Sequence, residues 1–468
     1  MATVTSDVVW LSASDLVKGY RTRQLSPVEV TRAVLQQIDA LNPTLNAFCL
    51  VAHDEALAQA AASEARWMRG TPQGELDGVP VSIKDLVLTR GWPTLRGSKT
   101  VDPAGPWNDD APAVARLRES GAVLLGKTTT PEFGWKGVTD SPLTGVTRNP
   151  WNPAKTPGGS SGGGAAAVAS GMGALTIGTD GGGSIRIPCA FSGLFGLKPT
   201  FGRVPAWPLS PFGTVAHLGP MTRTVTDAAL FMNVLTQPDA RDWLTLPENG
   251  RDYRIGVDDG VRGWRIAYSG DLGHAHVDRD VQSIVERAAQ RFAELGATVE
   301  DASPNLDGAD AVFRAHWYSG AAYVLRSFTS EQKALMDPGL VQTAELGARF
   351  TMLELYEAMQ RRGVLGIEMS RFHQRYDLLL TPTVPLVAFD AGRNVADIVR
   401  EKQWTDWTPF SYPFNLTQQP AATIPCGLTA DGLPVGLQIV GPRYADARVL
   451  RAARAFESLQ PIPAPPIG

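Results

Sequence analysis

The sequence predicts an α/β protein, because segments with helical spacing alternate along the chain with short apolar segments typical of strands. The first clear helix is expected to begin at Ser26-Pro27, where a cap residue precedes proline at the first helical position, and Glu29 follows three residues after the cap. Apolar residues then recur at helical spacing until Asn42-Pro43, where we expect this helix to end. A second helix is expected over residues 54–69, ending at Gly70.

The alternation continues through the rest of the chain. Residues 78–83 are predicted to form a short strand, and Lys84-Asp85 lie at its C-terminal end, where chemistry usually gathers in open α/β sheets. Residues 238–275 are rich in Asp, Gly and Pro and are expected to be a connection. The other expected elements are helices over 113–119, 162–172 and 281–295, and strands over 122–125, 174–177, 377–381, 422–425 and 436–440.

Composition and charge argue against several classes of function. The 43 basic and 47 acidic residues give a net charge of −4, and no run of Lys and Arg could follow a phosphate backbone, so nucleic acid is not an expected partner. Residues 1–10 lack signal-peptide features, and no segment reaches about 18 uninterrupted apolar residues, so we expect a cytoplasmic protein without membrane contact. Three widely spaced cysteines and the absence of metal-binding motifs predict neither a metal nor a disulfide framework.

Two serines set in glycine-rich runs are the most informative feature of the sequence. Ser160 lies within residues 157–164, and Ser184 lies within residues 178–186. Glycines bunched in this way let backbone amides crowd around a ligand where a side chain would obstruct them. The pattern predicts a serine nucleophile beside an oxyanion hole, with either serine eligible.

Two other motifs offer alternatives. Residues 121–128 match the phosphate-loop pattern GxxxxGK[ST], but their central positions are themselves an apolar strand, so we do not expect nucleotide binding. Residues 159–163 match the GxSxG pattern of α/β-hydrolases, which would make Ser161 the nucleophile of an esterase with a later acid and histidine. That interpretation leaves residues 181–184 unexplained, and nothing local singles out one of the later histidines.

Lys84 is the candidate base. A serine hydroxyl needs a base to become nucleophilic, and without a histidine a neutral lysine can take this role. For that role at neutral pH the pKa of Lys84 must fall from about 10.4 to about 7, which corresponds to about 4 kcal/mol against the charged form. Burial beside the apolar strand could supply this bias, whereas a tight ion pair with Asp85 would oppose it.

At this point the residues resemble a known family, the amidase signature enzymes. The resemblance is specific over about residues 75–235 and looser on either side of them. The matching segments are 78–85, 126–128, 147–152, 157–164, 178–188 and 196–200. The resemblance implies that Ser184 is the nucleophile, that Ser160 is a bridging serine preceded by a cis peptide bond, and that Lys84 is the base.

The resemblance also implies what surrounds these three residues. The backbone amides expected to form the oxyanion hole are those of Gly181, Gly182, Gly183 and Ser184. The side chains expected to support the site are those of Ser161, Thr179, Asp180 and Arg186, the last three by bracing the loop rather than by touching substrate. Phe133 and Trp135 fall where this family often lines its acyl pocket. Further aromatic walls could come from Trp207, Trp317, Tyr318, Trp404 and Trp407.

Length alone would allow about three domains or one large α/β domain, and the resemblance implies one domain over residues 1–468. Its fold would be a large, mostly parallel or mixed sheet with helices on both faces. The expected parts are N-terminal helices over about 8–70, the signature core over about 75–235, a variable substrate-shaping region over about 238–420, and C-terminal strands and a helix over about 420–460.

The implied reaction is hydrolysis of an amide to an acid and an amine or ammonia through a covalent acyl-Ser184 intermediate. The supply of aromatic residues favours apolar or aryl amides, and the same machinery could cleave esters, anilides or carbamates. No cofactor is expected. The expected partner is a small-molecule amide substrate, and a homodimer is the usual default.

One member of this family has a different role, as the glutaminase subunit of the complex that amidates misacylated tRNA. This chain carries Gly181 and Ile187 where that subunit typically has Thr and Gln. Residues 349–354 also lack its usual Arg-Ile-Met-Leu-Gly segment, which helps to hold glutamine. We therefore expect a stand-alone amidase, and the alternative is the glutaminase subunit.

Overall fold

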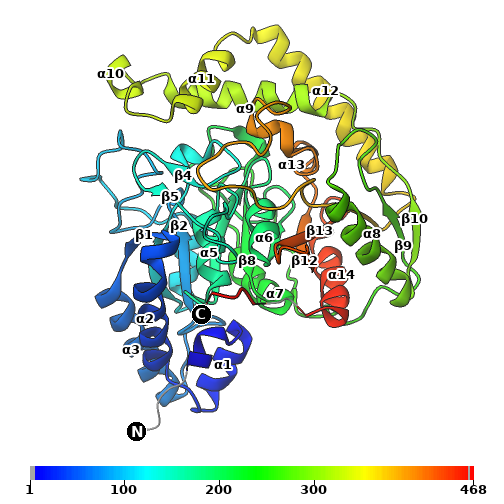
Figure 1. Cartoon of the computed structure of the whole chain (residues 1–468). Coiled ribbons are helices and arrows are strands. Elements are labelled where there is room, and N and C mark those ends of the chain that lie inside the picture. Colours follow the sequence, from blue (N-terminus) through cyan, green and yellow to red (C-terminus); the bar gives the residue numbers. More distant parts are fainter. Residues whose placement is uncertain (1–5, 462–463, 468) are drawn as a thin grey trace.

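One sheet of eleven strands forms the centre of the protein (Figure 1). The computed structural model describes residues 6–461 and 464–467. The strands of this sheet lie in the order β1-β3-β2-β6-β8-β7-β12-β13-β11-β9-β10. Their bounds are β1 Phe48–Val51, β2 Pro80–Lys84, β3 Val123–Thr128, β6 Leu175–Asp180, β7 Phe195–Lys198, β8 His217–Thr222, β9 Arg265–Tyr268, β10 Thr298–Asp301, β11 Leu378–Pro382, β12 Ala421–Leu428 and β13 Pro434–Val440. A separate two-stranded sheet is formed by β4 Asp140–Ser141 and β5 Gly145–Val146.

The central sheet is mixed, and antiparallel pairs are in the majority. Strands β2 and β3, β2 and β6, β9 and β10, and β9 and β11 are parallel, whereas the remaining neighbours run antiparallel. Every residue of β2, β3 and β13 is buried, which requires cover on both faces of the sheet. The expectation of an α/β fold with a large mostly parallel or mixed sheet is therefore confirmed, with a mixed sheet.

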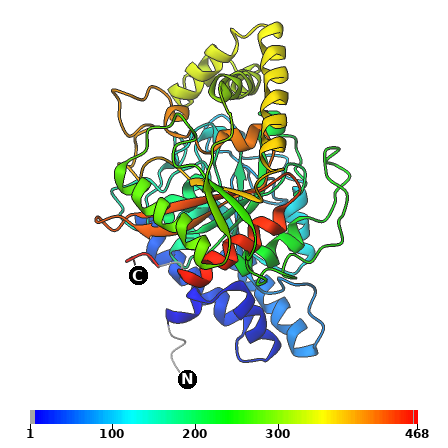
Figure 2. The same cartoon turned by 90° about the vertical axis from the view of Figure 1, so that its right-hand side faces the viewer.

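Fourteen α-helices within the described ranges surround this sheet. Their bounds are α1 Ala13–Arg21, α2 Pro27–Leu45, α3 His53–Arg69, α4 Pro112–Glu119, α5 Gly162–Ala169, α6 Arg186–Ser192, α7 Val225–Leu235, α8 Arg279–Glu294, α9 Ala309–Leu325, α10 Ser330–Lys333, α11 Pro338–Gly347, α12 Met352–Phe372, α13 Tyr412–Leu416 and α14 Asp446–Leu459. Helix α9 packs against both α11 and α12, and the three form a cap above one end of the sheet (Figures 1 and 2). Among the described helices, none combines the length and the apolar character needed to cross a bilayer.

The local signals placed several helix ends correctly, but α5 ends at Ala169 rather than at Met172, and α2 also ends elsewhere than expected. The Ser26 hydroxyl accepts hydrogen bonds from the first amides of α2, and Gly70 ends α3 in the left-handed conformation. However, α2 does not end at Asn42-Pro43 and continues to Leu45. Pro43 lies in the last turn, where a missing N–H costs only one helical bond, and the Asn42 Oδ1 atom accepts the amides of the two residues that follow Asn46 at 2.8 Å each.

Several strands differ from the sequence-based expectation: β1, β7, β8 and β10 were not expected, and β3 and β9 bear on particular predictions. Strand β3 extends to Thr128, so the Gly126-Lys127-Thr128 part of the phosphate-loop pattern is strand and forms no loop around a phosphate. Strand β9, with the sequence Arg-Ile-Ala-Tyr, lies inside the segment expected to be a connection. Four residues flanked by Asp and Gly are too few to stand out, and β9 is fixed by pairing with β10 and β11.

Candidate active site

Lys84 is the last residue of β2, in the parallel part of the sheet between β3 and β6. Its Nζ atom lies 2.7 Å from the Oγ of Ser160, 2.9 Å from the Oγ of Ser161 and 2.8 Å from the Oγ1 of Thr179. The side chain is completely buried. Burial lowers the pKa of Lys84 well below its usual range, and the charge of Asp180 opposes this only in part. A neutral amine in contact with three hydroxyl groups is able to accept a proton.

Asp85 does not form the ion pair with Lys84 that would have kept the amine charged. Its carboxylate lies 3.4 Å from the Nζ of Lys127. Lys127 in turn donates to the carbonyl of Val87 at 2.9 Å and to the hydroxyl of Thr94 at 2.7 Å. The Lys-Thr portion of the phosphate-loop pattern therefore has a structural role, because Lys127 neutralises the aspartate that follows Lys84.

The Gly159-Ser160 peptide bond is cis, as the resemblance implied. A Cβ atom on Gly159 would lie 2.4 Å from the carbonyl oxygen of Val138, so only glycine fits at this position. Ser160 itself is almost fully buried and leads through Ser161 into α5. The loop thus presents the Ser160 hydroxyl to Lys84 from the N-terminal end of a helix.

Ser161 joins the site to the second glycine-rich loop. Its amide donates to the carbonyl of Ser184 at 3.2 Å, and its hydroxyl both donates to and accepts from the backbone of Thr179 at 3.2 Å. Among the described residues, the hydrogen-bond partners of the Ser161 hydroxyl are thus the Lys84 amine and the Thr179 backbone, and neither is a histidine. The arrangement that an α/β-hydrolase nucleophile requires is therefore not formed around Ser161.

Ser184 lines the same cavity as Ser160, but the two hydroxyls are not joined by a hydrogen bond. Across residues 6–461 and 464–467, the Ser184 hydroxyl has no hydrogen-bond partner at all. Catalytic hydrogen bonds are often long or unformed without substrate. The structure therefore brings both serines to one cavity wall and leaves the Ser184 hydroxyl free to turn toward a ligand.

Three of the four amides expected in the oxyanion hole remain available. The amide of Gly183 is the exception, because it donates to the Asp180 Oδ1 atom at 2.7 Å. Gly183 has φ of 124°, which only glycine adopts easily and which turns its N–H toward Asp180. In the part of the chain that is described, the amides of Gly181, Gly182 and Ser184 have no protein acceptor. The Gly183 amide thus helps to hold the loop through Asp180 and does not act as an oxyanion donor.

The brace is a buried ion pair between Asp180 and Arg186. The guanidinium Nε and Nη2 atoms each lie 2.9 Å from a carboxylate oxygen, and both side chains are completely buried. Burial by itself would raise the pKa of Asp180, but the charge and hydrogen bonds of Arg186 outweigh it and hold the pKa well below its usual range. The ion pair therefore stays charged and fixes the loop between β6 and α6.

Residues from the C-terminal part of the chain complete the brace. The remaining hydrogen bonds of Arg186 reach the carbonyl of Ser411 at 2.9 Å, the Oε1 of Gln438 at 2.7 Å and the Oδ1 of Asn415 at 2.7 Å. The Ser411 hydroxyl also donates to the carbonyl of Gly182 at 2.6 Å. These residues lie more than two hundred positions after the loop, and no motif in the sequence marks them.

Aromatic side chains explain why the loop is built of glycines. A Cβ atom on Gly181 would lie 2.7 Å from the Trp317 ring, and one on Gly182 would lie 2.7 Å from the Phe313 ring. The rings of Phe313 and Trp317 are stacked with centroids 5.4 Å apart. The loop at residues 181–182 therefore packs directly against the two aromatic side chains of α9.

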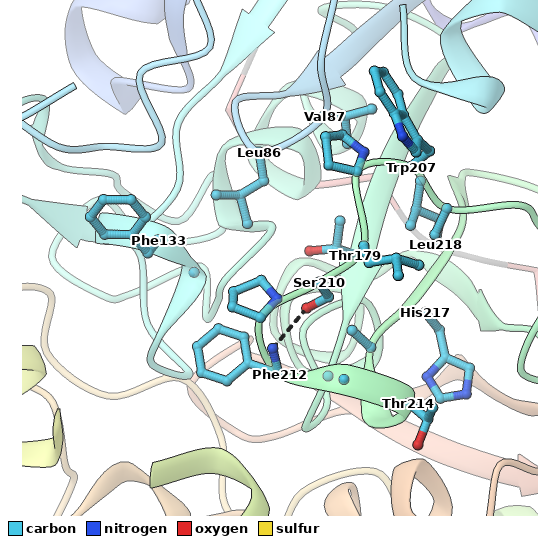
Figure 3. Close-up of a pocket in the computed structure, with 18 of the residues that line it drawn as sticks. Leu86, Val87, Phe133, Thr179, Trp207, Ser210, Phe212, Thr214, His217 and Leu218 are labelled. Carbon is cyan, nitrogen blue, oxygen red and sulfur yellow. Dashed lines mark hydrogen bonds between the residues drawn. The ribbon is translucent and has the colours of Figure 1, made fainter. Parts of the chain in front are cut away.

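The cavity beside these serines has a volume of about 850 Å³ and is mainly apolar (Figure 3). Leu86 and Phe133 lie on one side of it, and Trp207 and Leu218 lie on the other. The other large apolar side chains that line it are Val87, Val204, Leu209, Phe212, Trp243, Leu244, Trp317, Val324 and Phe328. A concave, mainly apolar cavity with a few polar groups is typical of small-molecule sites.

The expectation for the predicted pocket aromatics is corrected in part. Phe133, Trp207 and Trp317 line the cavity, whereas Trp135 does not. The Trp135 indole points away and donates to the Asp337 carboxylate at 3.2 Å, while its carbonyl accepts the indole N–H of Trp317 at 2.9 Å. The aromatic side chains that pack elsewhere in the interior are Tyr318, Trp404 and Trp407.

These features together are those of an acyl-transfer site in which a serine attacks a carbonyl. The chain matches the Amidase family over residues 29–450, and it therefore belongs to the amidase signature family of amidohydrolases.

Two kinds of relative match almost the whole chain. An acylamidase from Rhodococcus erythropolis is 39% identical, with 97% of this chain and 96% of the relative covered. One subunit of the glutamyl-tRNA(Gln) amidotransferase of Myxococcus xanthus is 36% identical, with 96% of each covered. Among solved structures, a bacterial aryl acylamidase of the same family superimposes with a TM-score of 0.90 at 34% identity, covering 97% of this chain and 96% of that one.

Proposed function

We propose that the chain is a stand-alone amidase that hydrolyses apolar acyl amides, aryl amides foremost, through an acyl-Ser184 intermediate. The observation that carries this proposal is the apolar cavity of about 850 Å³ onto which Ser160, Ser184 and Thr179 open. Two similar proteins, the Rhodococcus erythropolis relative and one structural neighbour, are described as acylamidases, which supports the same substrate class.

In the proposed mechanism Lys84 is the base and Ser160 relays the proton. As the Ser184 oxygen attacks the amide carbonyl, its proton passes to Ser160, and the Ser160 proton passes to the Lys84 amine. The amides of Gly181, Gly182 and Ser184 stabilise the oxyanion. The proton then returns through Ser160 to the leaving nitrogen as the C–N bond breaks. Water repeats the sequence on the acyl-enzyme, releasing the acid.

The tRNA-linked glutaminase is the alternative, and identity alone does not separate it from an acylamidase. The packing around Gly181 favours the acylamidase, since a threonine there would put a Cβ atom into the Trp317 ring. Ile187 is fully buried and does not line the cavity. Residues 349–354 contribute no side chain to the cavity wall and are largely exposed.

A substrate panel tests the proposal. Aryl amides, aliphatic amides, carbamates and glutamine are incubated with the purified chain, and the released amine or ammonia is measured. We expect the highest kcat/KM for aryl amides, because their rings fill an apolar cavity. Hydrolysis of glutamine with no turnover of the other amides would reverse the assignment.

We further propose that the chain forms a homodimer through one face of α12. Ala358, Leu365, Met369 and Phe372 bury the opposite face of this helix. The large apolar side chains that it leaves 42–79% exposed are Met352, Leu353, Tyr356, Met359, Val364 and Ile367. Together these side chains expose on the order of 600 Å² of apolar surface, close to the roughly 800 Å² of surface that each partner buries in a standard interface. Because the stripe lies on one helix at the edge of the molecule (Figure 2), a twofold axis can pair it with its own copy.

Sedimentation of the wild type and of Met359→Glu/Ile367→Glu tests this interface. The double variant is expected to sediment as a monomer while retaining catalytic activity, because neither side chain lines the cavity. Ile255→Glu, at a side chain 75% exposed in a turn elsewhere, is the matched control and should leave the dimer intact. A monomeric wild type, or a dimeric double variant, would contradict the proposal.

A further inference from the structure

Arg96 stands out among the residues that line the cavity. It is partly buried in the same wall as Phe133 and Ser160. Within residues 6–461 and 464–467, its guanidinium makes no hydrogen bond and no ion pair. The acidic residue whose charge acts on it, Asp85, is occupied by Lys127 at 3.4 Å. Five N–H donors in an apolar cavity are thus left without a protein acceptor.

Three other arginines with buried or partly buried guanidinium groups donate hydrogen bonds to protein acceptors. Arg186 pairs with Asp180, Arg223 donates to four backbone carbonyls, and Arg362 donates to Leu416 and Thr214. Arg326, which also lines the cavity, donates to the carbonyl of Tyr323 and stacks on its ring. Partial burial removes water from a cation and costs free energy unless a partner replaces the water, and no protein group among the described residues does so at Arg96.

The backbone at Arg96 is held in an unusual conformation. Its φ is 57°, in the left-handed region that residues other than glycine rarely adopt. The Arg96 amide donates to the carbonyl of Asp85 at 3.1 Å, and its carbonyl accepts the amide of Phe133 at 2.8 Å. Both backbone groups of Arg96 are therefore fixed. Its N–H is held by Asp85, which follows Lys84 in the chain, and its C=O is held by Phe133, which lines the cavity. Such local strain tends to persist where a site requires it.

No free acidic group on the described cavity wall compensates the positive charge of Arg96. The carboxylate of Asp242 is also on the wall, but both of its oxygens accept backbone amides, from Ala206 at 2.8 Å and Leu244 at 2.9 Å. His217 is held neutral, since burial lowers its pKa well below the usual range. The described wall therefore carries a net positive charge, centred on two arginines of which only Arg326 is partnered.

From this geometry we infer that Arg96 binds a carboxylate on the substrate and so determines specificity. This inference rests on the proposed amidase function and narrows its substrate class: acyl amides that carry a carboxylate away from the scissile bond. A guanidinium can bind a carboxylate through two parallel hydrogen bonds. This contact would satisfy two of the free N–H donors of Arg96 and orient the scissile amide of the substrate at Ser184.

Two matched pairs of substrates test the assignment. One pair places the carboxylate on the amine side, as 4-acetamidobenzoate with 4-methylacetanilide as its neutral counterpart. The other places it on the acyl side, as succinanilate with 4-methylpentananilide. In Arg96→Gln, kcat/KM is expected to fall about 10- to 100-fold for at least one carboxylate substrate, mainly through KM, and to stay within about twofold for both neutral ones. Arg254→Gln, at a partly exposed arginine that does not line the cavity, is the control and should change neither ratio.

A binding measurement separates this inference from the proposed function. Calorimetric titration of both carboxylate compounds into Ser184→Ala, with and without Arg96→Gln, reports the subsite without requiring turnover. Weaker binding by about the same factor in the double variant supports the subsite even if neither compound is hydrolysed. Equal affinities in the two proteins, or a parallel loss on neutral and charged substrates, would overturn the role of Arg96.

Discussion

Replacing Lys84 by methionine is expected to lower kcat by about 10³-fold or more, and Ser184→Ala should have a comparable effect. Methionine keeps the volume of the buried side chain but removes the amine that contacts Ser160, Ser161 and Thr179. Without that amine, no group in contact with Ser160 can take the proton displaced as Ser184 attacks. Single-turnover kinetics with an aryl amide would measure the loss directly.

The pH dependence follows from the lowered pKa of Lys84. The neutral amine is the active form, so activity is expected to rise with pH and to level off well below the value of about 10.4 at which a free lysine titrates. Below the apparent pKa the rate should fall tenfold per pH unit, and the residual activity of Lys84→Met should lack this dependence.

Lys198→Met is the matched control for Lys84→Met. Lys198 is equally buried, but its amine donates to the carbonyl of Gln419 and contacts none of the three hydroxyls. We expect its kcat to stay within about tenfold of the wild type. Near wild-type turnover in Lys84→Met or in Ser184→Ala, with the fold verified by circular dichroism, would refute the assignment of the triad.

Arg186→Met is expected to lower the free energy of unfolding by about 3–5 kcal/mol, because it leaves Asp180 buried without its partner. The loss should exceed that of an ordinary ion pair, since Ser411, Asn415 and Gln438 also lose a hydrogen-bond partner. Urea denaturation monitored by tryptophan fluorescence gives the difference. Activity should fall as well, because the loop that presents Gly181 and Ser184 loses its brace.

Two further variants make this result specific. Asp180→Asn/Arg186→Met removes both charges and should be less destabilised than Arg186→Met alone. Arg254→Met breaks a partly exposed pair with Asp252 and should cost less than about 1 kcal/mol. If Arg186→Met were no less stable than Arg254→Met, the buried ion pair would not be what holds the loop.

Local signals in the sequence predicted much of the fold, because they act within a few residues. The cap at Ser26, the left-handed Gly70 and the apolar run before Lys84 each specify an element without distant contacts. Strand β9 was not predicted, because four residues between polar turns have no strong pattern and only pairing with β10 and β11 defines them. The end of α2 was likewise not predicted correctly from local signals. Its position beyond Pro43 depends on hydrogen bonds that the Asn42 side chain accepts from the residues after the helix.

The sequence alone also brought out Lys84, Ser160 and Ser184, since spacing and glycine content mark them in the chain. Tertiary structure decided what surrounds them: Lys127 rather than Lys84 pairs with Asp85, Gly183 donates to Asp180, and Trp135 faces away from the cavity. Arg96 and the C-terminal brace carry no motif. Their roles arise from burial and from contacts between segments far apart in the chain, which one-dimensional spacing does not encode.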